Sequence, residues 1–309
     1  MFFAIRFCFL VLLGTLAPPL STCQATRDMT ILAEKNSNRN TRPNRNSRPY
    51  LDLPLDQIAK QIPELKGIRP TTDQERLTTI LSQTAVKVDE LFNSVIDVLA
   101  QEDVIRARLS PSGSTSSHIR YDYLIVHHTK GNVRIIEEYR TDSRGNRVEQ
   151  VGLDQGFSLT SGFVLMCVHF ASGHQSDSRF RYLGQQLIGP RNTYVVGFSE
   201  LPEHPSAAVS GAWGNALFLI EGIAWVDEYS SEIIRMRTDL LAPLVQIGLD
   251  EQTTEVSFGE VRLSDESQPL WLPSGVTVEA ELQGTKFRNE HRYTNYRRYW
   301  VSSKIVVPN

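Results

Sequence analysis

The stretch Gly275–Gln283, with the sequence GVTVEAELQ, alternates apolar and polar side chains along its whole length. Val276, Val278, Ala280 and Leu282 would lie on one face of a strand, while hydroxyl, carboxylate and amide groups occupy the other face. Such alternation is typical of an antiparallel sheet that buries one face and exposes the other. This stretch therefore predicts a sheet with one apolar face.

The same alternation recurs through most of the chain. In Glu232–Leu241, Ile234 and Met236 are predicted to share one face with Thr238 and Leu240. Similar strands are predicted at 104–109, 119–126, 133–139, 180–187, 193–198, 217–226 and 253–261. About ten short strands follow one another with few helix-length segments between them, which favours an antiparallel sheet over β-α-β units.

Two segments break this pattern and are predicted to be helices. The first starts near Thr72, which has capping-box spacing to Glu75. It then places apolar residues at helical intervals: Leu77, Ile80, Leu81, Val88, Leu91, Phe92 and Val95. The second, residues 154–173, has the composition of a helix or a buried strand, and its length and small residues favour a helix. The predicted fold class is α+β, with a large antiparallel sheet and helices that cover its apolar face.

The N-terminus has an apolar run from Phe7 to Ala17 after one basic residue, Arg6. This run is about half the roughly 20 residues that a membrane-spanning helix needs. It predicts a signal peptide over residues 1–25, and thus a periplasmic or secreted protein. An uncleaved anchor, or a lipid anchor at Cys23, stays open as an alternative.

Residues 26–70 are predicted to be a flexible leader and linker. The sequence up to Tyr50 is rich in Asn, Arg and Pro and offers little to bury. Three prolines then punctuate residues 51–70, which favours an extended linker that partly docks on the domain. We expect the folded domain to span residues 71–309.

The C-terminal stretch Arg288–Ile305 combines arginines with aromatic rings, which is the composition of some nucleic-acid-binding surfaces. The whole chain has 32 basic and 35 acidic residues, a net charge of −3. An acidic, exported chain is a poor partner for nucleic acid. We therefore expect no nucleic-acid partner and predict a last strand from Tyr299 onward, with the preceding arginines on its solvent side or at its mouth.

The sequence contains no recognisable catalytic or metal-binding motif. His127 and His128 are adjacent and would point to opposite faces of a strand, so they cannot share one metal. His169 and His174 could approach each other but lack a third ligand nearby. Cys167 has apolar neighbours and is expected to be a buried, inert thiol. We therefore expect no enzyme activity, no metal and no cofactor.

Several blocks resemble a group of secreted acidobacterial proteins: SRFRYLGQQLIGPRNTYVVGFSELP, EGIAWVDEYSSEIIRMRTDLLAP, TTEVSFGEVRL, LWLPSGVTVEAEL and FRNEHRYTNYRRYWVSSKI. Their order also resembles, more distantly, the LolA-like fold of outer-membrane lipoprotein carriers. The resemblance covers about Asp97–Val307. It implies a half-barrel of about eleven antiparallel strands around helices, with an apolar concave face that accepts acyl chains.

Two hypotheses on function follow. In the first, a non-enzymatic envelope protein binds an acyl chain or a lipoprotein-like cargo on the concave face, with no membrane-spanning segment left after signal cleavage. The predicted lining residues are Tyr194, Val196, Phe198, Ile234, Met236, Val276 and Val278. In the second, an interaction or sensing module contacts another envelope protein. The predicted contact residues are Arg292, Tyr293, Tyr296, Arg297, Arg298 and Trp300.

Overall fold

The computed structural model describes residues 49–95, 97–110, 113–130, 133–148, 162–205, 207–211, 214–263 and 268–299. The predicted signal peptide, nearly all of the Asn/Arg-rich leader and Trp300 lie outside these residues. None of the helices in this part of the chain combines the length and the apolarity needed to cross a membrane.

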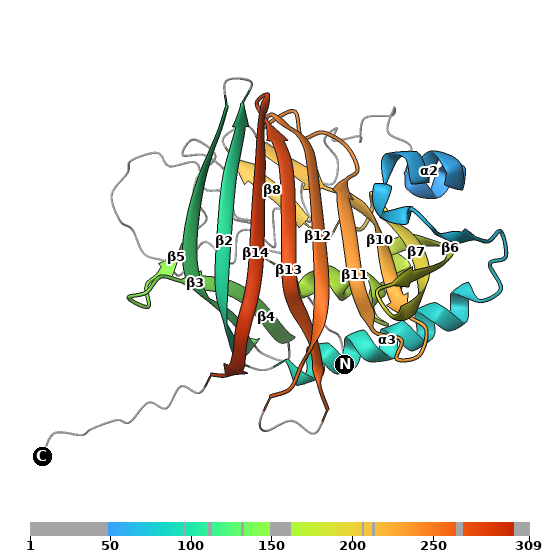
Figure 1. The fold of residues 1–309 in the computed structure, drawn as a ribbon, viewed down its shortest axis with the longest axis horizontal. Coiled ribbons are helices and arrows are strands. Elements are labelled where there is room, and N and C mark those ends of the chain that lie inside the picture. The colour runs from blue at the N-terminus through green and yellow to red at the C-terminus, as the bar shows by residue number, and fades with distance from the viewer. Residues whose placement is uncertain are drawn as a thin grey trace, which may run out of the picture.

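Twelve strands of the described residues form one open sheet, in which every neighbouring pair is antiparallel (Figure 1). In spatial order they are β1 (Arg69–Pro70), β6 (Ser178–Ile188), β7 (Arg191–Glu200), β10 (Ile220–Asp227), β11 (Ile233–Leu240), β12 (Leu249–Val261), β13 (Leu270–Leu282), β14 (Thr285–Arg298), β2 (Val98–Ser110), β3 (Gly113–Lys130), β4 (Val133–Thr141) and β5 (Arg147–Val148). The predicted antiparallel sheet is confirmed, and the count exceeds ten or eleven because the two edge strands have only two residues each.

A second, two-stranded sheet pairs β8 (Ala207–Gly211) with β9 (Gly214–Phe218). The single strand predicted at 217–226 is thus divided between the end of β9 and β10. The break falls at Leu219, which belongs to neither strand.

The main helix is α3 (Leu77–Ser94), which crosses one end of the sheet in Figure 1. Its buried residues include Ile80, Val88 and Phe92, as the helical spacing predicted. The predicted capping box at Thr72 was wrong, because the helix starts later and its N-cap residue Arg76 makes no side-chain cap.

The second predicted helix is a short 3-10 helix, η4 (Leu165–Phe170), in the described residues, while 154–161 lie outside them. All six of its residues are buried. Within residues 162–173 the predicted long helix is not found, because this run has no polar side to face water and packs as a buried segment instead. A one-turn 3-10 helix, η5 (Gln175–Asp177), follows it.

Residues 50–68 are packed against the sheet and contain η1 (Tyr50–Asp52), α2 (Leu55–Gln61) and η2 (Pro63–Leu65). They cover the face of β6, β7, β10 and β11 opposite to η4. The shared cluster contains Ile58, Ile62, Leu65, Leu183, Val195, Ile223, Trp225 and Ile234. The segment predicted to be an extended linker therefore holds a helix and buries apolar side chains, and these strands are covered on both faces.

Strand β14 occupies Thr285–Arg298, and the last strand predicted from Tyr299 onward lies, beyond Tyr299 itself, outside the described residues. Its buried positions alternate strictly from Phe287 to Tyr293, while Arg288 and Arg292 are exposed. Arg288 and Arg292 therefore belong to β14 itself and lie on its solvent side.

Candidate functional site

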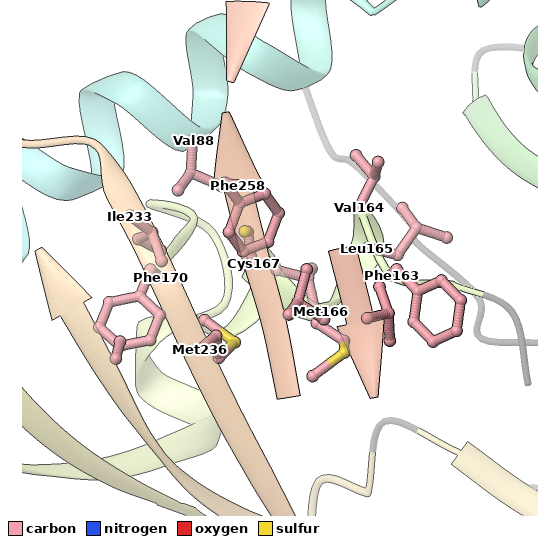
Figure 2. Close-up of a cluster of buried hydrophobic side chains, with 14 of the residues drawn as sticks. Val88, Phe163, Val164, Leu165, Met166, Cys167, Phe170, Ile233, Met236 and Phe258 are labelled. Atoms are coloured by element: carbon pink, nitrogen blue, oxygen red, sulfur yellow. The ribbon is translucent and has the colours of Figure 1, made fainter. Parts of the chain in front are cut away.

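The candidate site is the sheet face that carries η4, here called the inner face. Val88 of α3 and the η4 side chains Met166, Cys167 and Phe170 lie against sheet residues such as Met236 (Figure 2). The apolar cluster extends across the sheet from Ile136 on β4 to Tyr182 on β6. A single apolar cluster therefore spans most of the inner face, and α3 and the segment around η4 pack against part of it.

Most predicted lining residues lie on this inner face. Val196, Phe198, Met236, Val276 and Val278 are fully buried in the cluster that contains η4. Tyr194 is partly buried and packs against the same cluster.

Ile234 was predicted on this face, and the prediction was wrong. A bulge changes the register between β10 and β11: Trp225 pairs with Arg235, whereas Val226 pairs with Ile233. Ile234 is the extra residue and packs in the cluster under α2. A bulge interrupts strict alternation, so period-two spacing assigned the wrong face here.

The predicted interaction residues do not form one surface. Tyr293 is buried on the inner face, so its surface assignment was wrong. The Tyr296 hydroxyl donates a hydrogen bond to the Pro273 carbonyl (2.6 Å), and Arg298 donates to the Ser94 carbonyl (3.3 Å). Arg292 and Arg297 are exposed. The hypothesis of a protein-binding surface receives no specific support from this arrangement.

Sequence reasoning missed a charged cluster within the inner face. The Glu102 carboxylate on β2 forms a two-pronged ion pair with Arg140 on β4, and both side chains are almost completely buried. Glu102 also bonds His291 Nδ1 (2.8 Å) and accepts a hydrogen bond from the Tyr293 hydroxyl (2.6 Å). The detectable signal was a charged residue at an apolar-face position, with Ala100 and Val104 on either side of Glu102.

This cluster is electrostatically balanced. Burial disfavours the ionised carboxylate of Glu102, but the Arg140 guanidinium and His291 outweigh that effect and hold its pKa at about 2. Burial lowers the pKa of His291, and the charge on Arg140 adds to the shift. A neutral His291 whose Nδ1–H donates to Glu102 fits both observations.

A second buried carboxylate, Glu138 on β4, holds the segment that leads into η4. It accepts backbone N–H bonds from Phe163 (2.9 Å), Val164 (3.1 Å) and Leu165 (3.1 Å), and a hydrogen bond from the Tyr123 hydroxyl. Burial raises the pKa of Glu138, although these donors act in the opposite direction. Glu138 thus fixes the start of η4 against the sheet.

The remaining predicted chemistry is structural. Cys167 is a buried free thiol, as expected, and burial raises its pKa. His174 bonds Asp177 (3.1 Å) rather than His169. His169 stacks on Phe198, and burial lowers its pKa to about 4. Within the described ranges, no group of three His, Cys, Asp or Glu residues is placed to hold a metal ion.

The opposite, outer face holds residues 50–68 through polar contacts. Arg237 on β11 bonds Asp239 at 2.8 and 2.9 Å and reaches Glu64 at 3.2 Å. Glu221 accepts a hydrogen bond from the Tyr50 backbone N–H. Burial raises the pKa of Glu221 to about 8 from its ordinary 4.5.

The docking of residues 50–68 is expected to weaken as the pH rises. A carboxyl group whose pKa is raised on folding stabilises the folded state below its ordinary pKa, and this stabilisation is lost as the pH rises through 8. We expect the free energy of unfolding to fall by about 2 kcal/mol between roughly pH 6 and pH 8. Urea titrations at both pH values measure this change in the free energy of unfolding. The Glu221→Gln variant should show a smaller change with pH. An unchanged pH profile in that variant would contradict the assignment.

No protein-family model matches the chain, and no curated protein does. Among solved structures, it is similar to a DUF1329 family protein from Desulfovibrio piger, with TM-score 0.41, 8% identity, and coverage of 73% of this chain and 94% of that one. A putative outer-membrane lipoprotein-sorting protein domain from Vibrio parahaemolyticus matches with TM-score 0.37, 11% identity, and coverage of 70% and 91%. A LolA superfamily protein from Nitrosomonas europaea matches with TM-score 0.36, 11% identity, and coverage of 72% and 94%.

Proposed function

We propose that this protein binds a hydrophobic ligand, such as an acyl chain or a lipid-modified cargo, on the inner face of its sheet, and that it works in the cell envelope. The observation that carries the proposal is the width of the apolar inner face, whose cluster extends across most of the sheet. Apolar residues of this cluster extend from β4 to β6, and α3, the segment around η4 and residues such as Phe218, Leu244 and Ile247 pack against them. Burial of an acyl chain on such a face is favourable by about 0.8 kcal/mol per methylene.

Binding in this place requires the cover to move. The η4 segment occupies the inner face, and every residue from Phe163 to Ala171 is buried. Its C-terminal end is tied to α3 by Gln175, whose amide donates to the carbonyls of Leu81 (2.9 Å) and Phe170 (3.0 Å). We propose that this end separates from α3 when a ligand enters.

The proposal predicts co-purified lipid and uptake of an apolar probe. Organic extraction of the purified protein followed by mass spectrometry should release an acyl lipid, and the delipidated protein should take up a fluorescent fatty acid. Gln175→Ala should accelerate uptake about fivefold, because two hydrogen bonds of the closed cover are lost. Gln57→Ala, on the exposed side of α2, removes the same side chain as a matched control.

The expected control result is an unchanged uptake rate. Absence of both extractable lipid and probe uptake would overturn the proposed function.

A further inference from the structure

Asn289 and Arg106 lie directly opposite each other on neighbouring strands. Strands β14 and β2 are antiparallel, and their register pairs Asn289 with Arg106 and His291 with Val104. Directly paired residues project from the same face of a sheet. Phe287 and His291 lie two residues before and two residues after Asn289 on β14. Both are buried on the inner face. Asn289 is fully buried there, and Arg106 is half-buried.

Three buried polar atoms of this group have no hydrogen-bond partner in the part of the chain that the structure describes. They are Nδ2 and Oδ1 of Asn289 and Nε2 of His291. Buried polar atoms are nearly always paired, since leaving one unpaired is costly. A side-chain amide with neither end bonded therefore indicates a place where another molecule supplies the partners.

The charge at Arg106 is also uncompensated. Across residues 49–299, where described, no carboxylate lies within ion-pairing distance of Arg106. Glu102, four residues before Arg106 on the same face of β2, is already bonded to Arg140, His291 and Tyr293. A half-buried guanidinium in this setting attracts an anion more strongly than one in open water does.

The group offers a defined set of hydrogen-bonding positions. Arg106 and Asn289 Nδ2 are donors, whereas Asn289 Oδ1 is an acceptor. His291 Nε2 is a second acceptor, because its Nδ1–H is directed at Glu102. Val278, which is paired with Asn289 on its other side, belongs to the apolar cluster. A ligand group that fits must carry negative charge and a hydrogen-bond donor, next to an apolar tail.

We infer that Arg106, Asn289 and His291 form a headgroup subsite for an acyl lipid whose headgroup carries both an anion and a hydroxyl group. The anion bonds Arg106 and Asn289 Nδ2, while the hydroxyl donates to Asn289 Oδ1 or His291 Nε2. The tail lies along the inner face past Val278. This inference rests on the proposed function, because it specifies the class of ligand that the inner face takes.

The test compares three probes with the same acyl chain on the full-length protein: lysophosphatidylglycerol, monoacylglycerol and the free fatty acid. Lysophosphatidylglycerol should bind about tenfold more tightly than either of the others, since only it supplies both groups. Glycerol phosphate without a tail should not compete at the same concentration. Competition by glycerol phosphate at equal strength would overturn the lipid subsite.

Substitutions separate the two parts of the subsite. Arg106→Gln should weaken lysophosphatidylglycerol binding about tenfold and leave monoacylglycerol unchanged, while Arg106→Lys should keep most of the affinity. Asn289→Leu should weaken both hydroxyl-bearing probes and raise the urea midpoint of the free protein, because an unpaired buried amide is removed. Arg144→Gln, in the exposed turn before β5, is the charge control and should change nothing.

Equal affinity for all three probes, unaltered in Arg106→Gln and Asn289→Leu, would overturn the headgroup subsite and leave the proposed function standing. Absence of binding by every probe would overturn both.

Discussion

Replacing Glu102 by Gln is expected to lower the free energy of unfolding by about 3–5 kcal/mol. The carboxylate is fully buried and forms a two-pronged ion pair with Arg140, which is itself only 4% exposed. The amide leaves the guanidinium charged in a site with little water, and it weakens the bonds to His291 and Tyr293. A buried charge without its counter-ion is among the costliest defects in a protein interior.

Urea titration of the single and double variants measures this effect. Glu102→Gln with Arg140→Met should recover much of the loss, because a buried pair replaced by apolar or neutral groups is often tolerated. Glu290→Gln removes a carboxylate of the exposed pair with Arg288 and should change stability by less than about 1 kcal/mol. A loss below about 1 kcal/mol in Glu102→Gln would show that the pair contributes little to holding the inner face together.

The pH dependence of the same pair has the opposite sign to that of Glu221. The pKa of Glu102 is lowered to about 2, so its stabilisation is present above the ordinary value of 4.5 and is lost as the pH falls toward 2. Acid unfolding of the wild-type protein should therefore be steeper than that of Glu102→Gln.

Replacing Gly222 by Ala is expected to cost about 3 kcal/mol or more. A Cβ atom at this position on β10 would collide with the Arg237 carbonyl of β11 and would lie 2.8 Å from the Phe198 ring. This carbonyl belongs to the neighbouring strand, so the collision can be removed only if the two strands move apart. Phe198 cannot turn away easily, because it is fully buried and packs against Phe170 and His169.

Gly275→Ala on β13 is the matched control. Its nearest contact would be the His291 carbonyl at 3.7 Å, an ordinary van der Waals distance. We expect the free energy of unfolding to rise by no more than about 1 kcal/mol, because alanine restricts the unfolded chain. Equal stability of Gly222→Ala and Gly275→Ala in urea titrations would contradict the tight β10–β11 packing.

Strict alternation made much of the sheet predictable. From Val276 to Leu282 no bulge interrupts the pairing with β14, so apolar residues and the inner face coincide. At Ile234 the bulge shifts the face, and nothing in the local composition marks it. α2 was missed because three prolines between 51 and 70 favour an extended chain, although three apolar residues, Ile58, Ile62 and Leu65, are buried against the outer face.

The polar half of the site was harder to predict. Glu102, Arg140 and His291 come from three strands and lie 38 to 189 positions apart in sequence. Each one alone looks like a polar residue in an alternating strand, and only the strand order β14-β2-β3-β4 brings them together. Asn289 and Arg106 are neighbours for the same reason, so the subsite depends on register rather than on any local motif.

The most direct test of ligand binding on the inner face is photo-cross-linking with a fatty acid that carries a diazirine in its tail. Residue-level mass spectrometry then locates the adducts. We predict adducts on inner-face residues such as Met236, Val256 and Val278. Adducts confined to the outer face around Ile58 and Trp225, or none at saturating probe, would contradict the account.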